Sequence, residues 1–227
     1  MAVNVDTVYQ RVLALANKEQ RGYITPQEFN LFANQAQMDI FEQYFYDINQ
    51  FSRIPGNDTE YSDMLNYLEE KISLFEDKKD VNKNTAGTFY NISANISDLY
   101  KIGGISYDGY VCEKVNANHI ETINNAPLLR PTSYNPIYTL KDNKVYLYPI
   151  SLEDPITVNY IRRPEKVEWI SLGTGLYVSG VDFELHPSEE TKLVIKILGL
   201  AGITLKDPSL YQIAGAEDNK NIQQEKQ

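Results

Sequence analysis

Residues 25–46 read TPQEFNLFANQAQMDIFEQYFY, and they carry the strongest structural signal in the chain. Thr25 and Glu28 have the spacing of a capping box, and Pro26 suits the first helical position, where its missing N–H costs nothing. Behind them, apolar residues recur at intervals of three and four, which predicts a long helix. These residues form two strips: Phe29, Phe32, Ala33, Ala36, Ile40 and Tyr44 in the first, and Leu31, Met38, Phe41 and Phe45 in the second.

Two apolar strips predict a helix that is covered from more than one side. We expect the first strip to pack on other helices of the same chain. The second strip is expected to face either the inserted β domain or a neighbouring subunit, which makes Met38, Phe41 and Phe45 candidate interface residues.

Three further segments have helical periodicity. The first runs over residues 6–18 with Asp6 as its cap, and the second over residues 59–75. The third opens at Pro187, and its Glu189 and Glu190 suit the positive end of the helix dipole. A last short helix is expected after Asp207, followed by a polar, mobile tail over residues 217–227.

The pattern changes at Glu76, where EDKKDVNKN (76–84) predicts a linker or an exposed loop. Beyond residue 88, short alternating apolar runs predict β-strands, with turns at Gly103-Gly104 or Asp108-Gly109 and at Asp142-Asn143. Residues 162–181 have no clear period. We therefore predict an α+β protein, in which a helical bundle (1–80 and 182–216) is interrupted by an inserted antiparallel β domain (86–181), either a sandwich or a barrel.

Charge and composition narrow the possible functions. The 227 residues contain 21 Lys and Arg against 31 Asp and Glu, which gives a net charge of −10. An acidic chain is not expected to bind nucleic acid through contacts with its phosphates. A single cysteine, Cys112, rules out an internal disulfide framework. The N-terminus does not resemble a signal peptide, and no apolar run is long enough to predict a membrane span.

Residues suited to catalysis are few. Only His119 and His186 could act as histidine bases, and both are far in sequence from Cys112, which we expect to be a half-buried thiol in a strand. His186 precedes Pro187 at a helix start, a position more typical of a spacer or weak cap. No nucleophile elbow, phosphate-binding loop or zinc spacing occurs. We therefore predict no catalytic, cofactor-binding or metal-binding residues and no enzymatic activity.

Arg162-Arg163 is the most basic spot in the chain. The simpler interpretation is a solvated strand end, because exposed charges are common and contribute little individually. The alternative is an ion pair with an acidic neighbouring subunit. Arg162 and Arg163 are therefore added to the candidate interface residues.

Several stretches resemble a known group of proteins: residues 13–45, residues 156–166, residues 182–190 and residues 197–211. Together they resemble virion structural proteins of short-tailed phages of Bacteroidetes hosts, notably the crAss-like group. The order of helices, β insertion and returning helices is similar to that of head-to-tail adaptor and tubular-tail ring proteins.

This resemblance implies a subunit of a cyclic homo-oligomer, a dodecamer, in the neck or tail below the portal. The implied partners are the portal and other ring proteins, and DNA would pass through the lumen during ejection without specific binding. The protein would be made in the host cytoplasm and end in the virion, with no cofactor and no membrane partner. Two alternatives stay open: a receptor- or carbohydrate-binding virion protein that uses Tyr138, Tyr146 and Tyr148 as a stacking surface, and a lysozyme-like hydrolase with two carboxylates.

Overall fold

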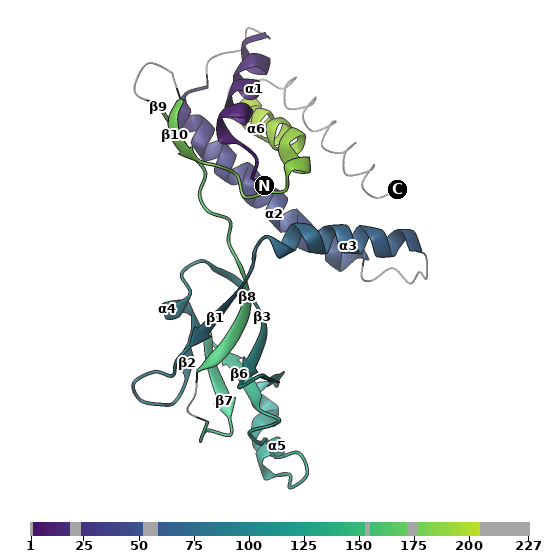
Figure 1. Ribbon diagram of the computed structural model, residues 1–227, viewed down its shortest axis with the longest axis vertical. Helices are drawn as coiled ribbons and strands as arrows, with labels where there is room; N and C mark the ends of the chain where they lie inside the picture. The colour runs from purple at the N-terminus through teal and green to yellow at the C-terminus, as the bar shows by residue number, and fades with distance from the viewer. Residues whose placement is uncertain (1, 19–23, 52–58, 153–154, 172–176, 205–227) are drawn as a thin grey trace. The chain divides into compact units, whose positions relative to one another are not determined.

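The structure is a computed structural model that describes residues 2–18, 24–51, 59–152, 155–171 and 177–204. The α+β class is confirmed, and the chain divides into two compact units (Figure 1). The helical unit comprises residues 1–74 and 164–227, and the β insertion comprises residues 75–163. The insertion was expected over residues 86–181, so both of its boundaries differ from the prediction. The helix predicted after Asp207 and the tail 217–227 lie outside the described residues.

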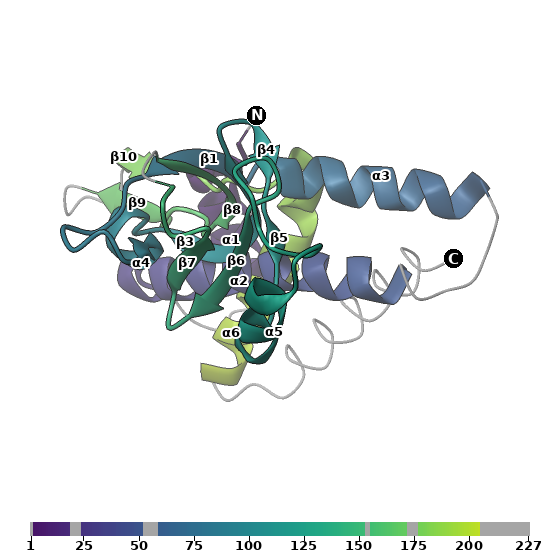
Figure 2. The same ribbon diagram turned by 90° about the horizontal axis from the view of Figure 1, so that it is seen from below.

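The helical unit contains four α-helices in its described part: α1 (Val5–Lys18), α2 (Pro26–Phe51), α3 (Thr59–Ser73) and α6 (Glu190–Thr204), the last preceded by the 3₁₀ turn η2 (Pro187–Glu189). α6 packs against both α1 and α2, and α3 lies alongside the C-terminal half of α2 (Figures 1 and 2). The predicted core face of α2 is confirmed, because Phe29, Ala33, Ala36 and Ile40 are fully buried. The core face of α6 is buried as expected: Leu193, Val194, Ile197, Leu198 and Ala201.

The start of α2 forms the predicted capping box. The backbone N–H of Glu28 donates to Thr25 Oγ1 at 3.3 Å, and the backbone N–H and hydroxyl of Thr25 donate to Glu28 Oε2 at 2.9 and 2.8 Å. These bonds favour the ionised carboxylate, so the backbone N–H and then the hydroxyl of Thr25 lower the pKa of Glu28.

The cap of α1 differs from the prediction. Asn4 begins the helix, since its Oδ1 accepts from the backbone N–H of Thr7 at 3.0 Å, and Asp6 lies inside the first turn. The Asp6 carboxylate instead accepts a hydrogen bond from the indole N–H of Trp169 at 3.0 Å. Asn and Asp both favour this position, so a tertiary partner decided between them.

A β-hairpin completes the helical unit, where the sequence predicted irregular structure within the insertion. Strands β9 (Glu168–Ser171) and β10 (Tyr177–Val181) pair antiparallel, and Trp169 is buried with its ring 4.1 Å from that of Tyr9. Gly180 is required there, because a Cβ would lie 2.3 Å from the backbone oxygen of Glu168. The strands are short, and their pattern is interrupted by an irregularity between Tyr177 and Ser179, so the hairpin has little sequence signal.

The insertion is built from two four-stranded sheets, ordered β1-β8-β3-β4 and β2-β7-β6-β5. Its strands are β1 (Glu76–Val81), β2 (Tyr90–Asn91), β3 (Leu99–Tyr107), β4 (Tyr110–Val111), β5 (Glu113–Lys114), β6 (Ile137–Lys141), β7 (Lys144–Tyr148) and β8 (Ile156–Arg162). Short helical segments interrupt them: α4 (Ile92–Asn95), η1 (Ala117–His119) and α5 (Ile120–Asn125). One apolar core joins side chains from both sheets, including Val158 and Tyr160 from one and Val145 and Leu147 from the other. The arrangement is a sandwich, and no closed barrel forms in the described part of the insertion.

The predicted hairpins of the insertion are present. Asp108 and Gly109 have φ values of 47° and 82°, and Asp142 and Asn143 have φ values of 51° and 57°, the positive φ at both central residues that a tight hairpin turn needs. Gly103-Gly104 is instead an irregularity inside β3, between the pairs formed by Ile102 and Ile105.

Strand β1 was predicted as a linker, which is wrong for residues 76–81. It forms the edge of the first sheet and pairs with β8 along its whole length, although five of its six side chains are exposed. Backbone hydrogen bonds hold an edge strand whatever its side chains, and charged residues there discourage pairing with other chains. A polar edge strand therefore lacks the apolar alternation on which the prediction relied.

Net charge is confined to one unit. The insertion contains ten Lys and Arg and ten Asp and Glu, so its formal charge is zero. The helical unit contains eleven Lys and Arg against 21 Asp and Glu, which accounts for the whole charge of −10.

Candidate functional site

The candidate interface strip on α2 is only partly exposed. Leu31 is 69% exposed, whereas Met38 and Phe45 are half-buried and Phe41 is fully buried. Met38 and Phe45 therefore keep some surface that a second subunit could contact, and their role as interface residues stays a prediction.

Phe41 must be removed from the candidate interface. Its ring lies edge-on to Phe45, 5.0 Å between centroids, inside a unit where α2 is packed by both α3 and α6. The second apolar strip thus serves the fold at this position. Phe41→Glu would bury a carboxylate, and we expect it to disrupt folding rather than assembly alone.

The arginine pair lies where β8 leaves the insertion. Arg162 is half-buried with its guanidinium over the ring of Phe75 at 5.8 Å, and its backbone N–H donates to the oxygen of Phe75 at 2.9 Å. Arg163 is exposed, and its backbone N–H donates to the oxygen of Asp98 at 2.7 Å. These contacts describe an ordered strand end, and the proposed intersubunit ion pair stays a prediction.

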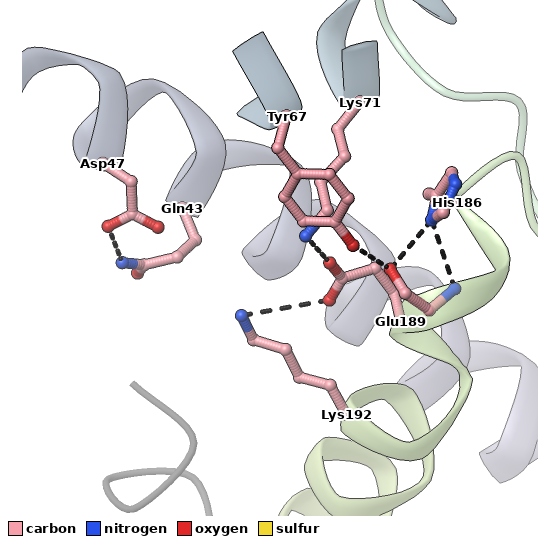
Figure 3. A network of polar contacts seen from close by, with 8 residues as sticks. Gln43, Asp47, Tyr67, Lys71, His186, Glu189 and Lys192 are labelled. Carbon is pink, nitrogen blue, oxygen red and sulfur yellow. Dashed lines mark hydrogen bonds and ion pairs between the residues drawn. The ribbon is translucent and has the colours of Figure 1, made fainter. Parts of the chain in front are cut away.

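A buried charge cluster lies between α3 and the start of α6 (Figure 3). Glu189 is 2% exposed, and its carboxylate receives the ammonium groups of Lys71 and Lys192 from two sides, the latter at 3.9 Å. The Lys71 ammonium also lies over the rings of Tyr67 and Tyr44, 4.4 and 5.3 Å from their centroids. A carboxylate shared by two buried ammonium groups ties α3 to α6 and is unfavourable to break.

His186 and Ser188 lie at the edge of this cluster. Ser188 Oγ contacts His186 Nδ1 at 2.8 Å and accepts from the hydroxyl of Tyr67 at 2.9 Å, while the backbone N–H of Ser188 donates to the imidazole at 3.3 Å. The imidazole thus acts as the predicted weak helix cap. This local geometry is that of a helix start, and the other histidine, His119, is exposed and belongs to the other unit.

A second polar feature on α2, here called the amide ladder, consists of Asn30, Asn34 and Gln37. Asn30 exchanges two hydrogen bonds with the backbone of Trp169, at 2.9 and 3.1 Å. Asn34 exchanges two with the backbone of Val167, both at 2.9 Å. Each side-chain amide therefore satisfies a backbone N–H and a backbone C=O that a neighbouring strand would otherwise pair with.

The spacing of the ladder matches a helix to a strand. Four residues of helix rise about 6 Å, close to the roughly 6.6 Å that two residues of strand span, so Asn30 and Asn34 meet Trp169 and Val167. Three residues of helix rise only about 4.5 Å. The longer Gln37 makes up the difference, reaching the oxygen of Glu165 at 2.8 Å and accepting from the backbone N–H of Glu184 at 3.2 Å.

The amide ladder and the charge cluster were both missed by sequence reasoning. The ladder has a signal, Asn-x₃-Asn-x₂-Gln at helical spacing, but amides between two apolar strips usually indicate a solvated face. The cluster has a weaker one, a lysine (Lys71) among the apolar residues of α3.

Cys112 was expected to be half-buried within a strand; it is instead almost fully buried and lies between β4 and β5, where the chain passes from one sheet of the insertion to the other. Burial raises the pKa of its thiol to about 11, so it is protonated and unreactive at neutral pH. The neighbouring Tyr138 has its phenol pKa raised by burial and, to a lesser extent, by Cys112.

The proposed tyrosine stacking surface does not form as a set. Tyr138 points into the core and is 5% exposed, whereas Tyr146 and Tyr148 are half-buried and alternate with the buried Val145 and Leu147. Opposite faces of the sheet therefore carry Tyr138 and the other two rings. The alternative of a carbohydrate-binding surface loses one of its three residues.

Neither a metal-binding cluster nor a membrane-spanning helix occurs in the described part of the chain. Among these residues, no group of three or more His, Cys, Asp or Glu side chains could hold a metal ion. Within the same residues, none of the helices combines the length and apolarity that crossing a membrane requires. The sequence matches no protein-family model and no curated protein.

Proposed function

We propose that the chain is a virion structural protein without enzymatic activity, a subunit of a neck or tail ring below the portal of a short-tailed phage. The observation that carries this proposal is the split helical unit, closed by α6 after a self-contained β-sandwich of residues 75–163. That order of elements is the one implied by the resemblance to head-to-tail adaptor and tubular-tail ring proteins.

Charge distribution supports the same proposal. The excess of ten acidic residues lies in the helical unit, while the insertion is neutral. An acidic wall repels phosphate, so a ring that turned its helical units inward would let DNA slide without binding it. The lumen in this proposal is formed by many copies of the chain and recognises no sequence.

The described polar clusters have a structural use, which also supports a non-enzymatic role. The charge cluster joins α3 to α6, and the amide ladder joins α2 to residues 165–184. Both are occupied by contacts within the fold.

The experiment that tests the proposal is native mass spectrometry of the full chain over a range of concentrations, followed by electron microscopy of the assembled species. We expect a single closed ring with one subunit number, and labelling of phage particles should place the protein at the portal vertex. A chain that stays monomeric at every concentration, or that labels elsewhere on the particle, contradicts the proposal.

A further inference from the structure

The insertion carries an apolar loop on its surface, in the segment 126–136 between α5 and β6. Leu128 is 99% exposed, and Leu129 and Tyr134 are 67% and 68% exposed. The exposed Arg130 lies among them in sequence. Isolated apolar residues on a surface need no explanation, but three in one short loop indicate a contact surface.

The loop is held in this exposed conformation by hydrogen bonds within the loop itself. The N–H of Leu129 donates to the oxygen of Ala126 at 3.2 Å, and Thr132 and Asn135 close a second turn with bonds of 3.2 and 3.3 Å. Pro131 is buried and anchors the segment. A loop that is already ordered loses little conformational entropy when it binds, which favours its use as an anchor.

The helical unit offers a face of matching character on its β9–β10 hairpin. Trp169 points inward, so the outer face of β9 carries Glu168, which is exposed, and Ile170, which is 41% exposed. Val178, at the irregularity in β10, adds a side chain that is 51% exposed. This outer face is apolar with an acidic residue beside it, whereas the loop is apolar with a basic one.

Charge indicates which surfaces of two copies can meet. Two helical units would bring together surfaces that each carry the excess of ten acidic residues, so their contact is opposed by repulsion. A neutral insertion can approach a helical unit without that penalty, and Arg130 then adds an attraction to Glu168.

We propose that the apolar loop of one copy docks on the outer face of the β9–β10 hairpin of the next copy, with Arg130 facing the partner's Glu168. Such a contact joins two different surfaces of the same chain, which is the kind of interface that closes into rings. The inference rests on the proposed function, because it names one contact through which that ring would assemble.

Charge reversal tests this contact in the full chain. Arg130→Glu and Glu168→Arg should each weaken assembly about tenfold or more, because each places like charges together, and the double variant should return assembly to near the original level. Lys101→Glu and Glu42→Arg are matched controls, as both reverse an exposed charge on the same units away from the proposed contact. The concentration dependence of ring formation by native mass spectrometry is the readout, and circular dichroism checks that every variant is folded.

Cross-linking gives a second readout that does not depend on charge. In a Cys112→Ala background, Leu129→Cys and Val178→Cys are prepared as separate proteins and mixed with a short bis-maleimide. We expect a cross-linked dimer when the two proteins are mixed and none when either protein is treated alone.

The outcomes distinguish the two proposals. If the unmodified chain forms rings but the charge reversals behave like their controls, or the double variant does not recover, the contact is wrong and the proposed function stands. A further variant carries both Leu129→Cys and Val178→Cys in one Cys112→Ala chain; if it links only within one molecule, the loop binds its own hairpin and the contact between copies is also wrong. If the unmodified chain never assembles, the proposed function itself fails.

Discussion

Glu189→Gln should destabilise the helical unit far more than the same change at the next residue. The substitution keeps the shape of the side chain but leaves the buried ammonium groups of Lys71 and Lys192, 5% and 6% exposed, without the carboxylate they share. Removing one partner of a buried ion pair costs about 3 to 5 kcal/mol. The Lys192 ammonium is 3.9 Å from the Glu189 carboxylate, so that pair is not at its closest, and the aromatic rings over Lys71 stay in place after the substitution. We therefore expect a value inside this range, about 4 kcal/mol.

Trp169 makes this effect measurable for one unit alone. It is the only tryptophan of the chain, and it is buried in the helical unit. Urea unfolding followed by its fluorescence therefore reports the unit that contains Glu189. With a slope of about 2 kcal/mol per molar urea, a loss of about 4 kcal/mol lowers the midpoint by about 2 M.

Glu190→Gln is the matched control. Glu190 pairs with Arg11 at 3.0 Å, but the arginine side chain is 53% exposed, so the loss should be about 0.5 kcal/mol. Combining Glu189→Gln with Lys71→Met should cost less than the sum of the two single changes, by about 1 kcal/mol or more, since the second change removes a charge that the first has stranded. Equal midpoints for Glu189→Gln and Glu190→Gln would refute the assignment of the cluster as a buried, mutually dependent set.

Three further predictions concern single positions. Asn34→Ala removes both hydrogen bonds to the backbone of Val167 and should lower the stability of the helical unit by about 2 to 3 kcal/mol, with the exposed Gln35→Ala nearly neutral in the same Trp169 assay. Gly180→Ala should destabilise that unit because its Cβ would clash with a backbone oxygen at 2.3 Å, whereas Gly104→Ala, with its nearest neighbour at 3.8 Å, should leave the insertion folded by circular dichroism. Cys112 should resist thiol reagents at pH 8, because burial raises the pKa of its thiol to about 11 in the folded chain; rapid labelling of the folded chain at pH 8 would contradict this. The unfolded thiol loses its proton at lower pH than the folded one, so the free energy of unfolding should be unchanged below about pH 8.5 and fall as the pH rises toward 11.

Local rules predicted the features of the sequence that depend only on neighbours. Thr25 and Glu28 form their capping box within one turn, and Asp108-Gly109 makes its hairpin from its own backbone preferences. The α+β class followed from the order of such signals. These features need no partner from elsewhere in the chain, so their residues suffice to predict them.

Tertiary partners decided the rest. Glu189 was placed correctly in the first turn, but its ion pair with Lys71 spans 118 positions, and helix-dipole rules say nothing about it. Phe41 was assigned to a possible interface because no local pattern distinguishes a strip covered by the same chain from one covered by another. Strand β1 was predicted as a linker or loop because its side chains show no apolar alternation. Its partner β8 pairs with its backbone, and that pairing does not depend on which side chains β1 carries.

The two pieces of the helical unit are joined by polar contacts of one kind, each linking a residue before the insertion to one after it. Gln37 binds the backbone of residues 165 and 184, and Asp182 accepts from the first N–H of α1, that of Val5, at 2.8 Å. Lys71 binds Glu189 in the same sense. These contacts restrict the register between the pieces, because each amide or carboxylate meets particular partners, whereas apolar packing alone tolerates sliding. The chain returns to the helical unit after an insertion of 89 residues, and the returning segment needs such specific partners to bind in one register. This need explains why α2 carries amides at positions where an ordinary surface helix carries charges.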